Sequence, residues 1–353
     1  MYLQNIERPD INIIGLDIHS ANFTMAVLNT QGKICSCLSR ATSAENLIDV
    51  VSKVKGPRKL VVEESHLAQW VKSTLEPYVD KLIISDPKEN RWIARADFTD
   101  DRQSAIKLAQ LLMGGYIKEI YHPDDGGAEL RSLFIHYHHV NHQINRFKNK
   151  LKALYRQVGI KASGTGIYDK QQWSVWKEKL KSYPHLLFQA NQLFSLIDSL
   201  EEMKEETKSS LIKRAKKFPV YDLLREIPGV GSVIASGYIA MIITPHRFSK
   251  KNKLWRYANL GTTYHVSDQV VYKDEKSKTG NRVLKWVVFQ HFRKAVHICK
   301  SSNRFKQQYV ELRSRGLSEK VARRHVCRSL LSVIRAVWMK GESYQDKFYK
   351  IID

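Results

Sequence analysis

The sequence predicts a mixed α/β domain, then a helical arm, then a mainly helical C-terminal domain. Up to residue 127, short β-branched apolar runs alternate with amphipathic runs. Between residues 128 and 218 apolar side chains recur at spacings of three and four, which is the helical period. Two further helical patterns flank Pro228-Gly229-Val230-Gly231. Since 353 residues suffice for two or three domains, we expect domains at 10–127, 128–218 and 219–353.

The first domain is expected to open with three strands joined by tight turns, at residues 11–18, 23–29 and 33–39. The elements expected next are a helix at 43–54 capped by Ser43, a strand at 59–65, a helix at 67–78, a strand at 81–86 and a helix at 100–115. This order is typical of a mixed sheet covered by helices.

The arm is expected to contain two long antiparallel helices. The apolar spacing of residues 130–158 returns in residues 193–211, and "GIKASGTGIYD" separates the two stretches. Sustained apolar spacing of this kind is typical of coiled coils. We therefore expect a coiled-coil arm that joins subunits into a homodimer or homotetramer.

The composition indicates a nucleic-acid partner. The chain has 58 Lys and Arg against 35 Asp and Glu, a formal net charge of +23. Such an excess calls for a polyanion, although it does not separate DNA from RNA. No run of eighteen apolar residues and no signal peptide is apparent, so we expect a soluble cytoplasmic protein with no membrane partner. Four cysteines without a C-x-x-C pair indicate reduced thiols.

Carboxylates stand at the ends of strands in the first domain. Asp17 closes the first strand, Glu63 closes the fourth, and Asp100 and Asp101 precede the helix after the fifth. If the first and fourth strands are neighbours, Asp17 and Glu63 lie side by side. Carboxylate oxygens suit Mg²⁺ or Mn²⁺, ions that often serve phosphodiester chemistry. The alternative is that each acid caps a helix or faces solvent, and Asp100 occupies a favourable N-cap position.

The motif order Gly-x-Asp, Glu at the end of the fourth strand and Asp-x-x-(Asp/Ser)-Ala at a helix start resembles the RuvC-like, RNase H-fold domain of DEDD insertion-sequence transposases and the related pilin-gene invertases. The resemblance extends over nearly the whole chain. It implies a metal site at Asp17, Glu63 and Asp101, with Ser104 in the place of the family's fourth acid. Either the Ser104 hydroxyl, directly or through a water, or Asp100 or Asp97 would then complete the site.

The segment "IPGVGSVIASGYIAMI" predicts a helix-hairpin-helix element. Gly229 and Gly231 permit a tight turn, and the free amides at a helix N-terminus can bind a phosphate. The alternative is a packing corner between two helices.

Downstream, "RFSKKNKLWRYANLGTTYHVSDQ" resembles the family segment that leads to its nucleophilic serine, which places Ser267 in that role. A serine hydroxyl needs a base or nearby cations to attack a phosphate, and His265 is a candidate base. Without the resemblance Ser267 is an ordinary loop serine. The candidate phosphate-binding cations are Lys276, Lys278, Arg282 and Lys285.

The resemblance implies a nucleoid-associated prokaryotic transposase that cuts and rejoins DNA with Mg²⁺, or Mn²⁺, and a serine nucleophile. It also implies a noncoding guide RNA, encoded beside the gene, that pairs with donor and target DNA. Two alternatives stay open: a junction-resolving nuclease that uses metal-bound water, and a nucleic-acid-binding protein whose metal site Ser104 has weakened.

Overall fold

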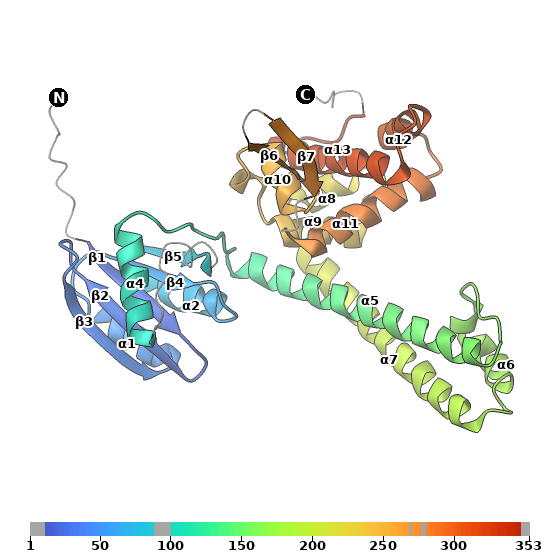
Figure 1. Ribbon diagram of the computed structural model, residues 1–353, viewed down its shortest axis with the longest axis horizontal. Helices are drawn as coiled ribbons and strands as arrows, with labels where there is room; N and C mark the ends of the chain where they lie inside the picture. The colour runs from blue at the N-terminus through green and yellow to red at the C-terminus, as the bar shows by residue number, and fades with distance from the viewer. Residues whose placement is uncertain (1–10, 88–99, 268–269, 277–279, 347–353) are drawn as a thin grey trace. The chain divides into compact units, whose positions relative to one another are not determined.

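The computed structural model describes residues 11–87, 100–267, 270–276 and 280–346, with only the backbone for residues 262–276. The chain divides into two compact units, Met1–Ala128 and Glu129–Asp353 (Figure 1). The second unit contains both the predicted arm and the predicted C-terminal domain.

The first unit is built on a five-stranded mixed sheet with strand order β3-β2-β1-β4-β5. The strands are β1 (Asn12–Ile18), β2 (Asn22–Leu28), β3 (Ile34–Ala41), β4 (Arg58–Glu63) and β5 (Lys81–Ser85). The first three pair antiparallel, whereas β4 pairs parallel with β1 and β5 parallel with β4. The predicted meander and the strands that follow it are therefore confirmed.

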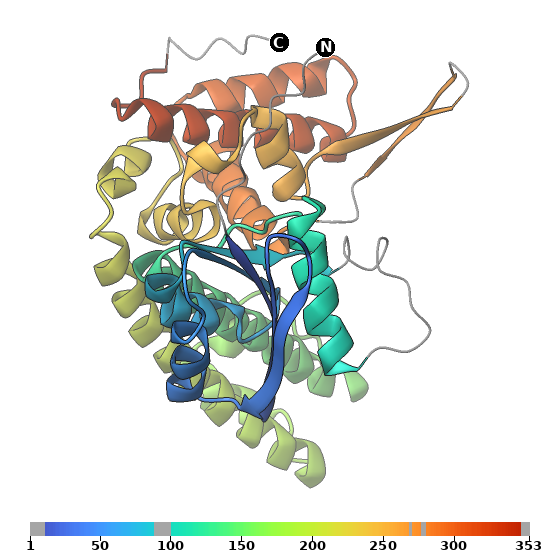
Figure 2. The same cartoon turned by 90° about the vertical axis from the view of Figure 1, so that its left-hand side faces the viewer.

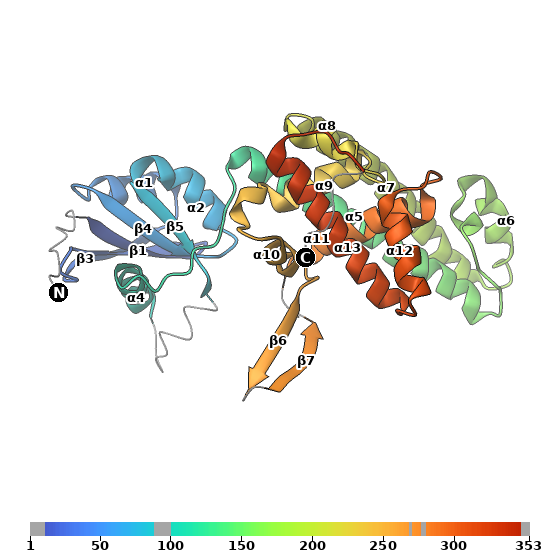
Figure 3. The same ribbon diagram turned by 90° about the horizontal axis from the view of Figure 1, so that it is seen from above.

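Helices cover both faces of this sheet (Figure 3). The helices α1 (Ala44–Ser52) and α2 (Ala68–Leu75), with the one-turn η1 (Glu76–Tyr78), lie on one face. They pack against Ile14 and Leu16 of β1. The opposite face carries α4 (Asp101–Met113), which packs against Ile13 through Ala109. As predicted, the Ser43 hydroxyl caps α1 by accepting a hydrogen bond from the Asn46 N–H.

Two long antiparallel helices follow, α5 (Asp125–Gln157), of which all but the first turn belongs to the second unit, and α7 (Pro184–Ala215). The Arg214–Glu129 ion pair links them at one end, and Lys148 Nζ lies 2.6 Å from Glu201 Oε1 farther along. Short helices cover the far end of the pair: η2 (Gly166–Tyr168), η3 (Lys170–Gln172) and α6 (Trp173–Glu178). The two predicted long helices are present, and their use as an oligomerisation arm stays a prediction.

The remaining chain forms a helical bundle with a two-stranded ribbon. Its helices are α8 (Val220–Arg225), α9 (Ser232–Ile242), η4 (Pro245–Arg247), α10 (Lys251–Tyr257), α11 (Arg282–Phe292), the π-helix η5 (Arg293–Ile298), α12 (Arg304–Ser314) and α13 (Glu319–Lys340). The antiparallel strands β6 (Thr262–Ser267) and β7 (Val270–Lys276) extend away from these helices (Figure 2).

The N-terminal part of α5 and the C-terminal part of α7 belong to the core of this bundle. Phe134 of α5 and Leu211 of α7 are fully buried in the same cluster as α9, α11 and α13. A Cβ on Gly237 would lie 2.5 Å from the Phe134 ring, so glycine allows this close packing. No helix in the described part of the chain is long and apolar enough to span a bilayer.

Candidate functional site

Two acidic residues meet at neighbouring strand ends in the first unit. In the parallel pairing of β1 and β4, Leu16 is opposite Val62, which makes Asp17 and Glu63 the next neighbours. The Glu63 charge also contributes to a raised pKa of Asp17. The predicted side-by-side placement of these two carboxylates is thus present.

The N-terminus of α4 brings further polar groups to Asp17. Asp101 is the first helical residue, and its charge is also felt by Asp17. Burial raises the pKa of Asp17, and the nearby Ser104 hydroxyl opposes part of that rise. The residue in the place of the family's fourth acid therefore lies beside the first acid.

Asp100 is the N-cap of α4, the alternative that the sequence left open. Its Oδ1 accepts a hydrogen bond from the Gln103 N–H at 2.7 Å. The helix therefore starts at Asp101 and does not extend back toward Asp97, which lies outside the described residues. Capping commits one Asp100 oxygen to the backbone, so Asp101 is the better placed of the two as a ligand.

Gly15 explains how α4 comes so close to β1. A Cβ on Gly15 would lie 2.0 Å from the Ala105 carbonyl oxygen and 2.8 Å from the Ala109 nitrogen. Because no real Cβ tolerates such contacts, any larger residue would push the helix away. The glycine two positions before Asp17 thus sets the distance between Asp17 and the start of α4.

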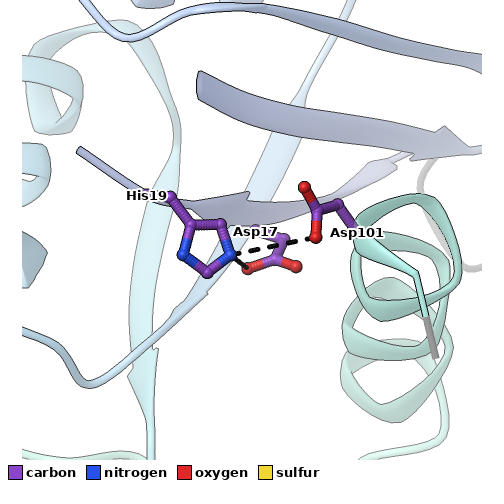
Figure 4. A group of neighbouring side chains, drawn as sticks. All are labelled: Asp17, His19 and Asp101. Atoms are coloured by element: carbon purple, nitrogen blue, oxygen red, sulfur yellow. Dashed lines mark ion pairs between the residues drawn. The ribbon is translucent and has the colours of Figure 1, made fainter. Parts of the chain in front are cut away.

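His19 also belongs to this group and was missed by the sequence analysis. Its Nε2 lies 3.5 Å from Asp17 Oδ1 and 3.9 Å from Asp101 Oδ1 (Figure 4). The turn between β1 and β2 holds its backbone: the His19 N–H donates to the Asn22 carbonyl at 2.9 Å, and the Thr42 hydroxyl donates to the His19 carbonyl at 2.8 Å. Its position two residues after Asp17 was the available signal.

The electrostatics of the group favour a bound cation. Burial raises the pKa of Asp17, and the charges of Asp101 and Glu63 raise it further, against opposing effects of His19 and Ser104. Single donor atoms of Asp17, His19 and Asp101 lie within 4.8 Å of one another. Ligands about 2.1 Å from a Mg²⁺-sized ion are separated by about 3 to 4 Å, so these residues fit a divalent ion.

The turn at Gly229 in the second unit packs closely against η5, and its binding of a phosphate stays a prediction. Gly229 has φ +86°, and a Cβ there would lie 2.6 Å from the Ala295 nitrogen. His291 Nε2 lies 2.9 Å from the Pro228 carbonyl and holds the turn from the other side. Gly231 is the partly exposed N-cap of α9, and its binding of a phosphate stays a prediction.

Ser267 and His265 both lie on β6, with Ser267 as its last residue, opposite Val270. Ser267 is therefore not a loop residue. Lys276 ends β7, and Lys278 lies outside the described residues. The side-chain roles predicted for these four residues stay predictions.

Arg282 and Lys285 belong to a cationic face on α11 and α13. Partial burial lowers the pKa of Lys285, and the charges of Arg324 and Arg282 lower it further, against an opposing effect of Cys327. Arg324, on α13, was not among the predicted contacts. Positive charges that repel each other are stabilised by an anion, and phosphates supply one.

One family match covers the part of the chain that carries the Gly229 turn, Ser267 and α11. No curated protein matches the chain significantly. Residues 221–310, from α8 into α12, match the model of the transposase IS116/IS110/IS902 family, and this match supports a role of the chain as an insertion-sequence transposase.

Proposed function

We propose that the chain is a DNA transposase and site-specific recombinase with a metal-dependent acidic site and a serine nucleophile. The observation that carries the proposal is the convergence of Asp17, Glu63 and Asp101, from β1, β4 and α4, on one place in a chain whose residues 221–310 match a transposase family. Three acids from separate elements suit phosphodiester chemistry better than they suit stability, because like charges destabilise the folded unit.

The sheet supports an RNase H-like, RuvC-like interpretation of the first unit. Three antiparallel strands are extended by β4 and β5 in parallel, with the acids where β1 and β4 end. This is an analogy of fold, and the chemistry rests on the acids themselves.

In the proposed site, Asp17, Glu63 and Asp101 would hold Mg²⁺ or Mn²⁺. When bound, the ion would supply Lewis-acid stabilisation of negative charge on the scissile phosphate. The Ser104 hydroxyl, beside Asp17, would donate a hydrogen bond that orients this carboxylate. Ser104 acts in this account as a positioning residue, which leaves the site one negative charge short of the family pattern.

The serine step proceeds by attack of the Ser267 oxygen on a DNA phosphorus. A Ser267 O–P bond forms, the bond to the leaving DNA oxygen breaks, and the hydroxyl proton passes to a base, for which His265 is the candidate. A DNA hydroxyl then attacks the phosphoserine and releases the serine. Basic side chains, among them Arg282 and Lys285, would bind the phosphate oxygens during both steps.

The proposal is tested by trapping the covalent intermediate. Wild-type protein incubated with labelled DNA carrying the element's ends and Mg²⁺ is expected to give a protein–DNA adduct that survives denaturation. Ser267→Ala should bind the DNA and give no adduct, whereas Ser301→Ala, an exposed serine in the matched segment, should behave as wild type. Adducts that persist in Ser267→Ala would remove the serine from the mechanism.

The same assay separates the alternatives. Metal-dependent cleavage without an adduct would indicate a junction-resolving nuclease that uses water. Tight binding without cleavage in either Mg²⁺ or Mn²⁺ would indicate a nucleic-acid-binding protein. Asp17→Asn is expected to abolish cleavage while the protein stays folded.

Two partners complete the proposal. A noncoding RNA would guide DNA choice, because positive charge binds a nucleic-acid backbone without reading its sequence. The paired helices α5 and α7 would join subunits into a dimer or tetramer. The guide RNA is tested by isolating RNA that co-purifies with the protein and asking whether it pairs with the element's junctions. The oligomeric state is tested by light scattering of the full chain.

A further inference from the structure

We infer that His19 is a nitrogen donor to the proposed metal site and that it gives the site a preference for Mn²⁺ over Mg²⁺. The inference rests on the proposed metal site and adds to it a ligand and an ion selectivity. It concerns a residue that the acidic motif does not contain.

The position of His19 is set by two kinds of contact. Its backbone is fixed in the β1–β2 turn by the hydrogen bonds to Asn22 and Thr42. Its Nε2 points at carboxylate oxygens from two different elements, 3.5 Å from Asp17 and 3.9 Å from Asp101. The imidazole therefore lies at the place where the strand acid and the helix acid approach each other.

The separations are those of ligands around one ion rather than of tight hydrogen bonds. N–H···O hydrogen bonds span about 2.7 to 3.2 Å, and both distances exceed that range. Adjacent and opposite ligands of a six-coordinate ion are about 3 and 4 Å apart. A cation between the three donor atoms would satisfy all of them at once.

The donor set decides the ion. Mg²⁺ is held almost entirely by oxygen ligands, whereas first-row transition ions accept imidazole nitrogen readily. Donor atoms of Asp17, Asp101 and His19 lie within 4.8 Å of one another, so the site offers two carboxylates and one imidazole to an ion, with Glu63 at the end of the neighbouring strand. Of the two ions proposed for the site, Mn²⁺ accepts an imidazole nitrogen more readily than Mg²⁺ does, so Mn²⁺ gains more from His19.

A different role for His19 makes the opposite prediction. If protonated His19 acts only as a cation between the two acids, it competes with the metal. Removing it would then tighten metal binding, whereas removing a ligand weakens it. The sign of the change in affinity therefore decides between the two roles.

The experiment is a Mn²⁺ titration of the full chain, without DNA, followed by electron paramagnetic resonance and repeated with Mg²⁺ as competitor. His19→Ala and His19→Gln should bind Mn²⁺ about tenfold or more weakly and change Mg²⁺ affinity much less. The control His185→Ala removes an exposed histidine of α7 and should change neither. Unchanged or tighter Mn²⁺ binding in both His19 variants would overturn the inference.

A second measurement needs no variant. Pulsed electron paramagnetic resonance of the wild-type Mn²⁺ complex should show coupling to an imidazole ¹⁴N, and its absence would also overturn the inference. Asp17→Asn separates a failure of the proposed metal site from a failure of the role of His19 in it. If it leaves Mn²⁺ binding intact, the proposed metal site itself is wrong. If it abolishes binding while both His19 variants bind Mn²⁺ as tightly as wild type or more tightly, only the role of His19 is wrong.

Discussion

The side-chain amide of Asn281 donates a hydrogen bond to the hydroxyl oxygen of Tyr257 at 3.0 Å. The same oxygen lies 3.4 Å from a guanidinium nitrogen of Arg131, on α5. Asn281 also caps α11 by accepting from the Leu284 N–H at 2.8 Å. One phenol thus connects α5, the end of α10 and the start of α11, beside both ends of the β6–β7 ribbon.

The surroundings of Tyr257 favour negative charge on its oxygen. Burial opposes ionisation, but Arg131, Arg247 and the Asn281 amide together outweigh it, so the pKa lies below the usual 10.0. Tyr257→Phe leaves these donors without their acceptor, and we expect a loss of about 1 to 3 kcal/mol in the free energy of unfolding. Urea unfolding measures this loss.

The control is Tyr309→Phe, in α12 of the same unit. The Tyr309 ring packs against Phe292 and His297, and the variant keeps both contacts. An equal loss in the two variants would show that the contacts of the Tyr257 hydroxyl contribute nothing specific.

Much of the first unit was predictable because local patterns determine it. The apolar runs predicted the strands, and Ser43 predicted the start of α1. Asp17 and Glu63 could be placed together because parallel neighbours end at the same edge of a sheet. His19 could not, because it lies beyond the strand, where the period of two no longer sets the direction of a side chain.

The parts of the structure that could not be predicted depend on contacts between residues distant in sequence. The approach of Gly15 to Ala105, and hence the place of Asp101, depends on how α4 packs, which no local pattern encodes. The same holds for Arg131 and Tyr257, which are 126 residues apart. Apart from the resemblance, the sequence indicated only a loop serine at Ser267, whereas the pairing of β6 with β7 places it on a strand.

The burial of His291 leads us to expect that the protein loses stability in mild acid. It is fully buried, and its Nε2 lies 2.9 Å from the Pro228 carbonyl, an acceptor, so Nε2 carries the proton. Nδ1 then accepts from the Tyr238 hydroxyl at 2.8 Å. Burial, with a smaller effect of Lys294 and against the hydrogen bond to Pro228, lowers the pKa of His291 from 6.5 to about 4.

The unfolded chain therefore binds a proton at His291 at a higher pH than the folded chain does. The stability from neutral His291 is complete above pH 6.5 and is lost as the pH falls toward 4, to a limit of roughly 3 kcal/mol. Unfolding curves between pH 7.5 and 4.5 measure this loss. His291→Gln should be less stable at pH 7.5 and should lose less between the two pH values, and a parallel decline in both proteins would contradict the assignment.

Replacing Gly15 tests whether the approach of α4 builds the acidic site. In Gly15→Ala the new Cβ meets the Ala105 backbone, so α4 must shift and carry Asp101 and Ser104 away from Asp17. We expect a loss of roughly 1 to 3 kcal/mol in stability and a Mn²⁺ affinity reduced by about tenfold or more.

The control for Gly15 is Gly126→Ala in α5, where a Cβ meets nothing within 4 Å. Circular dichroism should report retained secondary structure in both variants, and metal titration should separate them. Full Mn²⁺ affinity in Gly15→Ala would show that the distance between β1 and α4 does not limit the site.

The cationic face on α11 and α13 is expected to bind nucleic-acid backbone. Lys285→Gln and Arg324→Gln each remove one charge from a group whose members raise each other's electrostatic energy. If each contacts one phosphate, each variant should weaken DNA binding and lower the slope of log K against log salt by about 0.9. Titrations of one duplex at several salt concentrations give that slope.

Lys340→Gln, at the other end of α13, removes the same charge elsewhere and should leave the slope unchanged, because its ammonium lies 3.9 Å from Glu342. An equal fall in all three variants would mean that net charge, rather than this face, governs binding.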